Sequence, residues 1–244
     1  MWLLHSPKII TDGLVHAYDF ENILSYTGSG STVNSLVSNA TGTTTGTSFN
    51  STSPKSFSFG GDGDNINLSH GPIFNSALAG TIIVWADQDS TKTQIQTLYQ
   101  EGDANGLGTE KEFHFHVNTN DTLGFFAESA NGTGLSFNGS TATTANTFFC
   151  GAVSFPGFTS SPMSGKIYLN GVLDGSGSLS STYGGSGTPT ISKIGSMHDT
   201  SFPSGNPRAI KGKVAAVYIY NKELTDTEIL QNYNALKGRF GLWV

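Results

Sequence analysis

The chain has 244 residues, of which 12% are charged, and it carries a net charge of −6 at neutral pH. That is about half the charged fraction of an ordinary soluble domain, and Gly, Ser, Thr and Asn take its place. Because the sequence has no basic patch and no polybasic segment, we expect neither nucleic acid nor a membrane among its partners. The single cysteine, Cys150, excludes an intramolecular disulfide, and its apolar neighbours predict a buried thiol.

The first twelve residues predict an extended N-terminal arm. They begin with Met1-Trp-Leu-Leu4, and four apolar residues without a preceding basic residue are too few for a signal peptide. We therefore expect a protein that is made in the cytoplasm. Trp2 and Trp243 lie at the two chain ends, where an aromatic residue usually means that the end is docked. Both are docking candidates, onto this domain or onto a neighbouring protein.

From residue 13 onwards, short apolar or alternating segments between turn residues predict β-strands. The expected strands are 13–20, 56–59, 66–68, 80–86, 97–100, 112–117, 122–127, 134–137, 148–155, two within 165–174, 190–195 and 213–220. Asn170-Gly171 joins the pair within 165–174, and this dipeptide is the strongest short signal for a type I′ hairpin. So many short strands without intervening helices predict an antiparallel sandwich or barrel. No linker divides the pattern, so we expect an arm at 1–12 and a single domain at 13–244.

One helix is expected, close to the C-terminus. Thr225 and Glu228 have the spacing of a capping box, in which each side chain satisfies a free amide of the first helical turn. The apolar face of this helix is expected to hold Ile229, Leu230, Tyr233 and Leu236. Gly238 occupies the position of a C-cap glycine. The sequence thus predicts an all-β chain that ends in one short helix.

The turn that follows Phe59 carries the best oxygen cluster for a metal ion. Asp62, Asp64 and Asn65 could bind Ca²⁺, a hard cation that prefers carboxylate and carbonyl oxygens on a flexible loop. The same residues, with the glycines between them, also fit a tight turn between two strands. We favour the turn and keep calcium as the alternative.

A second cluster lies on the expected strand 112–117. Glu112, His114 and His116 alternate with Phe113 and Phe115, so the phenylalanines should point into the core and the polar side chains should share the other face. That face could contact a sugar or hold zinc, although neighbouring positions on one strand seldom converge on a tetrahedral ion. The usual case is a solvated face whose side chains need no partner. We take the three polar residues as ligand-face candidates.

Five motifs in a fixed order carry a resemblance to a known family. They are F-x-G-x-G-D-x-I-x-L at 59–68, T-I-x-V-W at 81–85, K-I-Y-L-N-G-V at 166–172, I-G-S at 194–196 and G-K-V-A-x-V-x-I-Y-N-x-x-L-T-x-x-E-I at 212–229. Together they resemble the concanavalin A-like lectin/glucanase superfamily, and within it the laminin-G-like jelly-roll domains. The likeness runs from about residue 13 to residue 242. It implies an all-β, antiparallel jelly-roll β-sandwich with one short C-terminal α-helix.

Two segments carry a narrower resemblance. The segments 13–32 and 232–241 are similar to jelly-roll modules of virion proteins from tailed phages. This implies a non-enzymatic structural protein at the virion surface, in a capsid decoration or in a fibre or tail, assembled in the host cytoplasm. Its expected partners are other virion proteins, further copies of itself and a host-surface glycan. The alternative is a lectin-like adhesion module that binds carbohydrate outside any virion.

An enzymatic role is disfavoured. The glucanases that the superfamily contains carry their catalytic carboxylates on one strand as E-x-D-x-x-E, and this chain has no such motif. Trp85 could be a sugar-stacking platform, but its β-branched neighbours predict a core position. We therefore expect no catalytic residues and no cofactor other than calcium.

Overall fold

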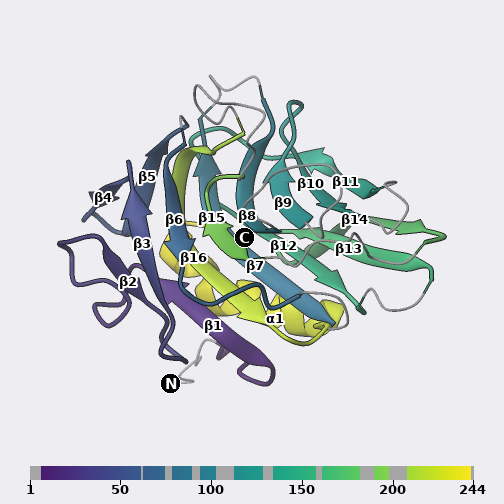
Figure 1. Ribbon diagram of the computed structural model, residues 1–244, viewed down its shortest axis with the longest axis horizontal. Helices are drawn as coiled ribbons and strands as arrows, with labels where there is room; N and C mark the ends of the chain where they lie inside the picture. The colour runs from purple at the N-terminus through teal and green to yellow at the C-terminus, as the bar shows by residue number, and fades with distance from the viewer. Residues whose placement is uncertain are drawn as a thin grey trace, which may run out of the picture.

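The structure is a computed structural model that describes residues 7–61, 63–74, 79–89, 94–102, 113–128, 134–157, 161–181, 190–197 and 208–242. In these residues, two antiparallel eight-stranded sheets pack face to face, and a short helix covers the outer face of one of them (Figure 1). This is the predicted jelly-roll sandwich with its C-terminal helix. Within the same residues, no helix is long and apolar enough to span a membrane.

Sheet A contains the chain's most apolar strands and its last one. Its members are β1 (Leu14–Asp19), β4 (Ser48–Asn50), β5 (Ser56–Gly60), β7 (Gly80–Gln88), β12 (Phe149–Phe155), β13 (Met163–Leu169), β14 (Val172–Leu179) and β16 (Lys211–Tyr220). The order is β14-β13-β12-β7-β16-β5-β4, and β1 pairs with β16 beyond the end of β5. β7 and β12 are buried along their whole length, as expected for strands between two layers.

Sheet B faces sheet A across the core. It consists of β2 (Thr32–Asn34), β3 (Thr41–Thr45), β6 (Asn65–Leu68), β8 (Gln96–Gly102), β9 (Phe113–Val117), β10 (Thr122–Ala127), β11 (Leu135–Ala142) and β15 (Ile191–Ile194). Its order is β11-β10-β9-β8-β15-β6-β3-β2. The sequence did not predict β2, β3 and β4, because they are short, lie at or near sheet edges, and consist largely of Thr, Ser, Gly and Asn.

Two apolar cores hold the layers together. The first lies between the sheets and is rich in aromatic rings, with Phe125 stacked at 5.8 Å from Phe155. The second lies between sheet A and the C-terminal helix. There Trp85 stacks on Phe240 at 4.2 Å and lies parallel to Tyr233 at 5.9 Å, so its predicted core position is confirmed.

The helix begins as predicted but ends differently. α1 (Asp226–Leu236) has its capping box: the Thr225 amide donates to Glu228 Oε2 at 2.8 Å, and the Glu228 amide donates to Thr225 Oγ1 at 3.3 Å. The helix continues as the 3₁₀-helix η1 (Lys237–Phe240), and the left-handed residue that ends it is Gly241. The prediction of Gly238 as the C-cap is wrong, because the extra turn brings Phe240 onto sheet A.

The predicted apolar face of α1 also needs correction. Leu230 is 41% exposed, whereas the polar residue Asn232 is buried. Asn232 Oδ1 accepts a hydrogen bond from the Ile10 amide at 2.7 Å, and its Nδ2 donates to the hydroxyl of Tyr220. An amide side chain stands at this position because it binds the backbone of the N-terminal arm.

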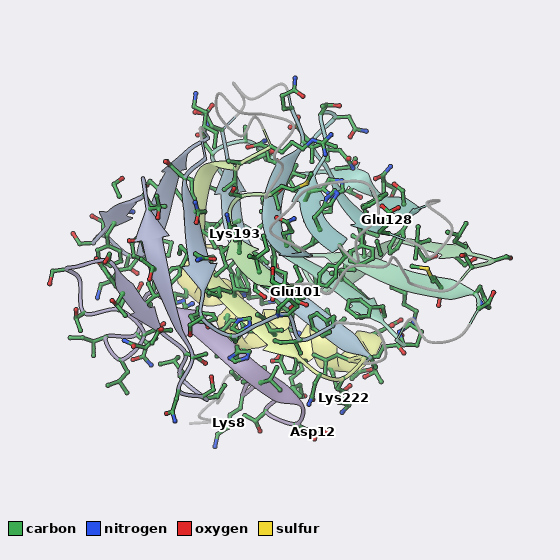
Figure 2. The ribbon with its side chains drawn as sticks, viewed as in Figure 1. Lys8, Asp12, Glu101, Glu128, Lys193 and Lys222 are labelled. Carbon is green, nitrogen blue, oxygen red and sulfur yellow. The ribbon has the colours of Figure 1, made fainter. Side chains whose placement is uncertain are left out.

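The described part of the arm is docked against α1 and β16. Besides the Ile10 contact, Lys222 pairs with Asp12 at 2.8 Å, and the two side chains lie together at one edge of the molecule (Figure 2). Trp2 and Trp243 lie outside the described residues, so their docking stays a prediction.

Candidate functional site

The predicted ligand-face residues lie on β9, and their alternation is as expected. Phe113 and Phe115 point into the core between the sheets, and His114 and His116 lie on the outer face of sheet B. The two histidines are only 5% and 4% exposed, so the expectation of a solvated face is wrong. Glu112 lies outside the described residues.

Both imidazoles belong to a chain of hydrogen-bonded side chains that runs from β9 to β11. Asn118 Nδ2 donates to Asn138 Oδ1 at 2.8 Å, which leaves Asn118 Oδ1 to accept from His116 Nε2 at 3.1 Å. His116 Nδ1 then has a lone pair, and His114 Nδ1 donates to it at 3.0 Å. Burial lowers the pKa of His116 to about 4 and the pKa of His114 well below its usual value. Both rings are therefore neutral at pH 7 and largely engaged with their neighbours.

Of the predicted calcium residues, Asp64 lies in the turn between β5 and β6, and Asn65 is the first residue of β6. Asp64 Oδ2 accepts a hydrogen bond from the Gly60 amide at 2.5 Å, and Asn65 Nδ2 donates to the Gly63 carbonyl at 2.8 Å. These are the contacts of a tight turn that closes on its own backbone. Within the part of the chain that the structure describes, no group of three His, Cys, Asp or Glu side chains could hold a metal ion. Asp62 lies outside that part, and calcium at this turn stays a prediction.

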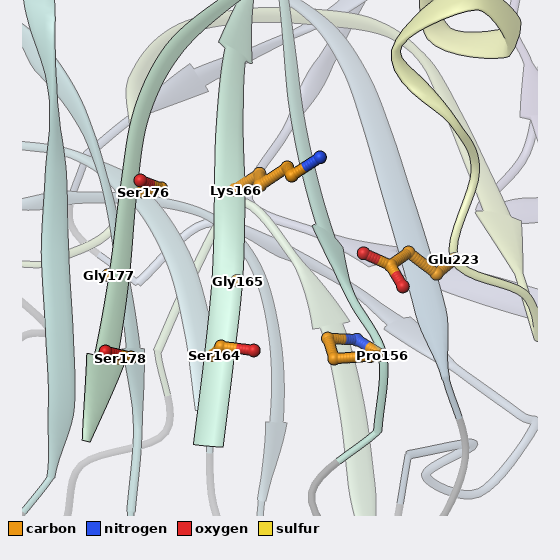
Figure 3. Close-up of a pocket in the computed structure, with 8 residues that line it drawn as sticks. All are labelled: Pro156, Ser164, Gly165, Lys166, Ser176, Gly177, Ser178 and Glu223. Carbon is orange, nitrogen blue, oxygen red and sulfur yellow. The ribbon is translucent and has the colours of Figure 1, made fainter. Parts of the chain in front are cut away.

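A groove on the outer face of sheet A was not predicted. It consists of two adjoining hollows, of about 380 and 400 Å³, that share Lys166 and Glu223. The first hollow is lined in addition by Pro156, Ser164, Gly165, Ser176, Gly177 and Ser178, and the second by Leu224, Thr225, Asp226 and Thr227. In Figure 3, Lys166 extends from β13, and Glu223 extends from the segment before α1 toward the same space. Hydroxyl groups and main chain supply most of the remaining surface.

The floor of the groove is built by the β13–β14 hairpin. Lys166 pairs with Ser176 and Ser164 pairs with Ser178, so these four side chains share the outer face of the sheet. The hairpin turn has φ angles of 52° at Asn170 and 80° at Gly171. Positive φ at both central residues confirms the predicted turn.

The same hairpin is supported from below by a side chain of sheet B. Phe137 packs against the backbone of Gly165 and Gly177, where an added Cβ would come within 2.8 Å and 2.5 Å of its atoms. Only glycine allows this approach, so the two glycines let an aromatic ring hold the floor in place. The groove therefore rests on the packed core.

The charged groups of the groove are of two kinds. Lys166 Nζ pairs with Asp226 Oδ1 at 3.1 Å, and the Tyr168 hydroxyl donates to the same oxygen at 2.8 Å. Hydrogen bonds from Tyr168 and Lys166 lower the pKa of Asp226, so this carboxylate is ionised at neutral pH. Glu223, by contrast, is half-buried and has no hydrogen-bonding or ion-pairing partner among the described residues.

Part of this groove had a signal in the sequence. Ser164 and Lys166, and likewise Ser176 and Ser178, alternate with residues that face the core, which is the pattern of one exposed sheet face. The sequence did not indicate that Glu223 lines the same groove, because this residue comes from a loop some fifty residues further along the chain. Its position follows only from the docking of α1 on sheet A.

Comparisons with known proteins agree with this architecture. The family model described as the concanavalin A-like lectin/glucanases superfamily matches residues 59–230. No curated protein sequence matches the chain. Among solved structures, the chain is similar to the CBM40 module of the Ruminococcus gnavus IT-sialidase bound to α2,3-sialyllactose, with a TM-score of 0.58, 15% identity, and coverage of 72% of this chain and 94% of the module.

The chain is also similar to a sialidase of Trypanosoma rangeli. The TM-score is 0.64 at 14% identity, and the match covers 95% of this chain and 34% of the sialidase. The chain thus spans about a third of that enzyme, and at such low identity the likeness concerns the fold. The family model itself covers well over half of the chain, so this protein belongs to the concanavalin A-like lectin/glucanases superfamily.

Proposed function

We propose that this protein is a non-catalytic carbohydrate-binding module whose glycan lies in the groove between β13, β14 and the start of α1. The observation that carries the proposal is the lining of the groove, in which hydroxyl groups surround one cation, Lys166, and one free acid, Glu223. Sugars offer hydroxyl groups that both donate and accept hydrogen bonds, so a surface with both kinds of partner suits them. The two hollows together have room for more than one sugar ring.

Asp226 is a poor candidate for the proton donor of glycoside cleavage. Glycoside hydrolysis ordinarily needs one protonated and one ionised carboxyl group beside the scissile bond. Asp226 is held in its ionised form by Lys166 and Tyr168, so it is unsuited to donate a proton. Burial raises the pKa of the Tyr168 hydroxyl, which makes it a poor nucleophile.

The fold supports a glycan ligand in a general way. The Ruminococcus gnavus module, which has the same fold, was solved with sialyllactose bound. Many unrelated functions share this fold, so the residues of the groove, and not the likeness, define the ligand.

A glycan array tests the proposal. We expect the purified protein to bind a restricted set of glycans. Binding should be the same with and without calcium, because the proposed contacts in the groove do not involve a calcium ion. A requirement for calcium would instead favour the turn at Asp62, Asp64 and Asn65. A blank array under both conditions would contradict carbohydrate binding.

We further propose, from the sequence resemblance of residues 13–32 and 232–241, that the module is carried on the surface of a tailed-phage particle in several copies. Co-purification with phage particles tests this second proposal. A protein found only free and monomeric would contradict it.

A further inference from the structure

The groove has an uncompensated negative charge. Lys166 and Asp226 neutralise each other across 3.1 Å, and Glu223 remains without a counter-charge among the described residues. The positive end of α1 does not supply one, because Asp226 and Glu228 already stand in its first turn. Glu228 is itself engaged by Lys222 at 2.8 Å.

A carboxylate in a partly enclosed groove favours a cationic group on the ligand. Lys166 offers a weaker attraction to an acidic sugar, because Asp226 offsets the charge of its ammonium group and Glu223 would repel a second carboxylate. The chain as a whole also carries a net charge of −6, which adds to the attraction of cations. The ligand must in addition be rich in hydroxyl groups, to match the serine and threonine side chains of the lining.

We propose that the groove selects glycans that carry a free, protonated amino group, such as units of glucosamine, over their N-acetylated or acidic counterparts. This inference rests on the proposed function and adds the chemical class of the ligand. The amino group would lie at Glu223, with the ring hydroxyls on the floor formed by Ser164, Ser176 and Ser178. The proposed ligand differs from the sialyllactose bound to the Ruminococcus gnavus module, which is acidic. We therefore do not propose sialyllactose as a ligand of this protein.

The test compares two ligands with the same sugar backbone, one with charged amino groups and one with neutral acetamido groups. A β-1,4-linked tetramer of glucosamine and its fully N-acetylated form are titrated into the protein at about pH 6, where the amines are protonated. For one ion pair in an open groove, we expect the amine form to bind about three- to fivefold more tightly. The preference should shrink as salt is added, because counter-ions screen the pair.

Two variants locate the charge. In Glu223→Gln, the preference for the amine form should fall by about three- to fivefold, the factor assigned to the ion pair. In Glu223→Lys, the amine form should bind more weakly still, because the new ammonium group repels it. The matched control is Glu128→Gln, which removes the same charge from the end of β10 on sheet B. The ratio should be unchanged in this control.

The outcomes separate the two proposals. Equal affinity of wild-type protein for both tetramers, or an amine preference that survives Glu223→Gln, would overturn the inference about charge and leave carbohydrate binding standing. Loss of the preference in Glu128→Gln would likewise overturn it, since the amine would then lie on sheet B. If no glycan of any class binds, the proposed function fails together with this inference.

Discussion

Glu101 shows how a single residue links the interior of the sandwich to pH. The residue is 1% exposed, and its label lies near the centre of the view in Figure 2. It accepts hydrogen bonds from the Tyr99 hydroxyl at 2.7 Å and from the Phe74 amide at 2.9 Å. Burial raises its pKa to about 7, and these hydrogen bonds only partly oppose the shift.

Because of Glu101, we expect the free energy of unfolding to fall as the pH rises from 4.5 through 7. The carboxyl group has a pKa of about 7 in the folded protein and 4.5 when unfolded, so its stabilising contribution is complete below pH 4.5 and is lost as the pH passes 7. Such a shift corresponds to about 3 kcal/mol. The variant Glu101→Gln keeps a neutral group at every pH, and chemical denaturation between pH 4.5 and 8 should therefore show no such loss.

Histidine titration changes the free energy of unfolding in the opposite direction to Glu101. The wild-type protein must therefore be compared with Glu101→Gln. The folded pKa values of His16 and His116 are lowered to about 4 from 6.5, so their contribution is present above pH 6.5 and is lost as the pH falls. These groups are the same in wild type and in Glu101→Gln, and the difference between the two curves isolates Glu101. Parallel curves would show that Glu101 is not the source.

At the scale of single residues, the sequence predicts which face of a sheet a side chain lies on better than it predicts whether that face is buried. The alternation on strand 112–117 correctly placed Phe113 and Phe115 in the core. It did not predict that His114 and His116 are buried as well, because the period of a strand says nothing about what lies over its outer face. The sequence also did not predict the hydrogen bond from the Phe74 amide to Glu101, because Phe74 lies in a loop twenty-seven residues away.

At the scale of elements, the C-terminal helix is held by aromatic stacking more than by its own sequence. Phe240 lies at 4.2 Å from Trp85 with an angle of 13° between the ring planes. Arg239, next to it, donates to Asp19 at 2.8 Å, and the Tyr218 hydroxyl donates to the same carboxylate oxygen. The last turn of the chain is thereby fixed to sheet A.

We predict that Phe240→Ala destabilises the protein by about 3 kcal/mol, because it removes a large buried ring and leaves a cavity over Trp85. The control is Leu230→Ala on α1, where the residue is 41% exposed and the loss should stay below about 1 kcal/mol. Equilibrium unfolding in denaturant measures both. Equal losses in the two variants would contradict the docking described here.

The sequence predicted those features of the elements that depend on neighbouring residues alone. The capping box of Thr225 and Glu228 and the turn at Asn170-Gly171 were both predicted and are confirmed. The end of the helix was predicted wrongly at Gly238, because a tertiary contact of Phe240 extends the chain by a 3₁₀ turn to Gly241. Such a contact has no local signal.

At the scale of the whole molecule, the two outer faces of the sandwich differ. Sheet A carries α1 and the arm over its outer face, and α1 can be followed in Figure 1. The groove lies at the β13–β14 end of the same sheet. Sheet B carries the buried histidine chain that the sequence singled out as a ligand face. The order of motifs predicted the fold, but the groove joins segments around residues 156, 164–178 and 223–227, and only the folded chain brings them together.

Titration of an array-positive glycan into two tyrosine variants tests the central claim most directly. Ser176→Tyr fills the floor of the groove, and Ser136→Tyr places the same ring on β11 of sheet B; both serines are exposed, so both proteins should fold. We predict that Ser176→Tyr weakens binding about tenfold or more, that is, by about 1.4 kcal/mol or more, and that Ser136→Tyr binds as wild type does. Unimpaired binding by Ser176→Tyr, with loss of binding in Ser136→Tyr, would contradict the groove and place the glycan on the histidine-bearing face.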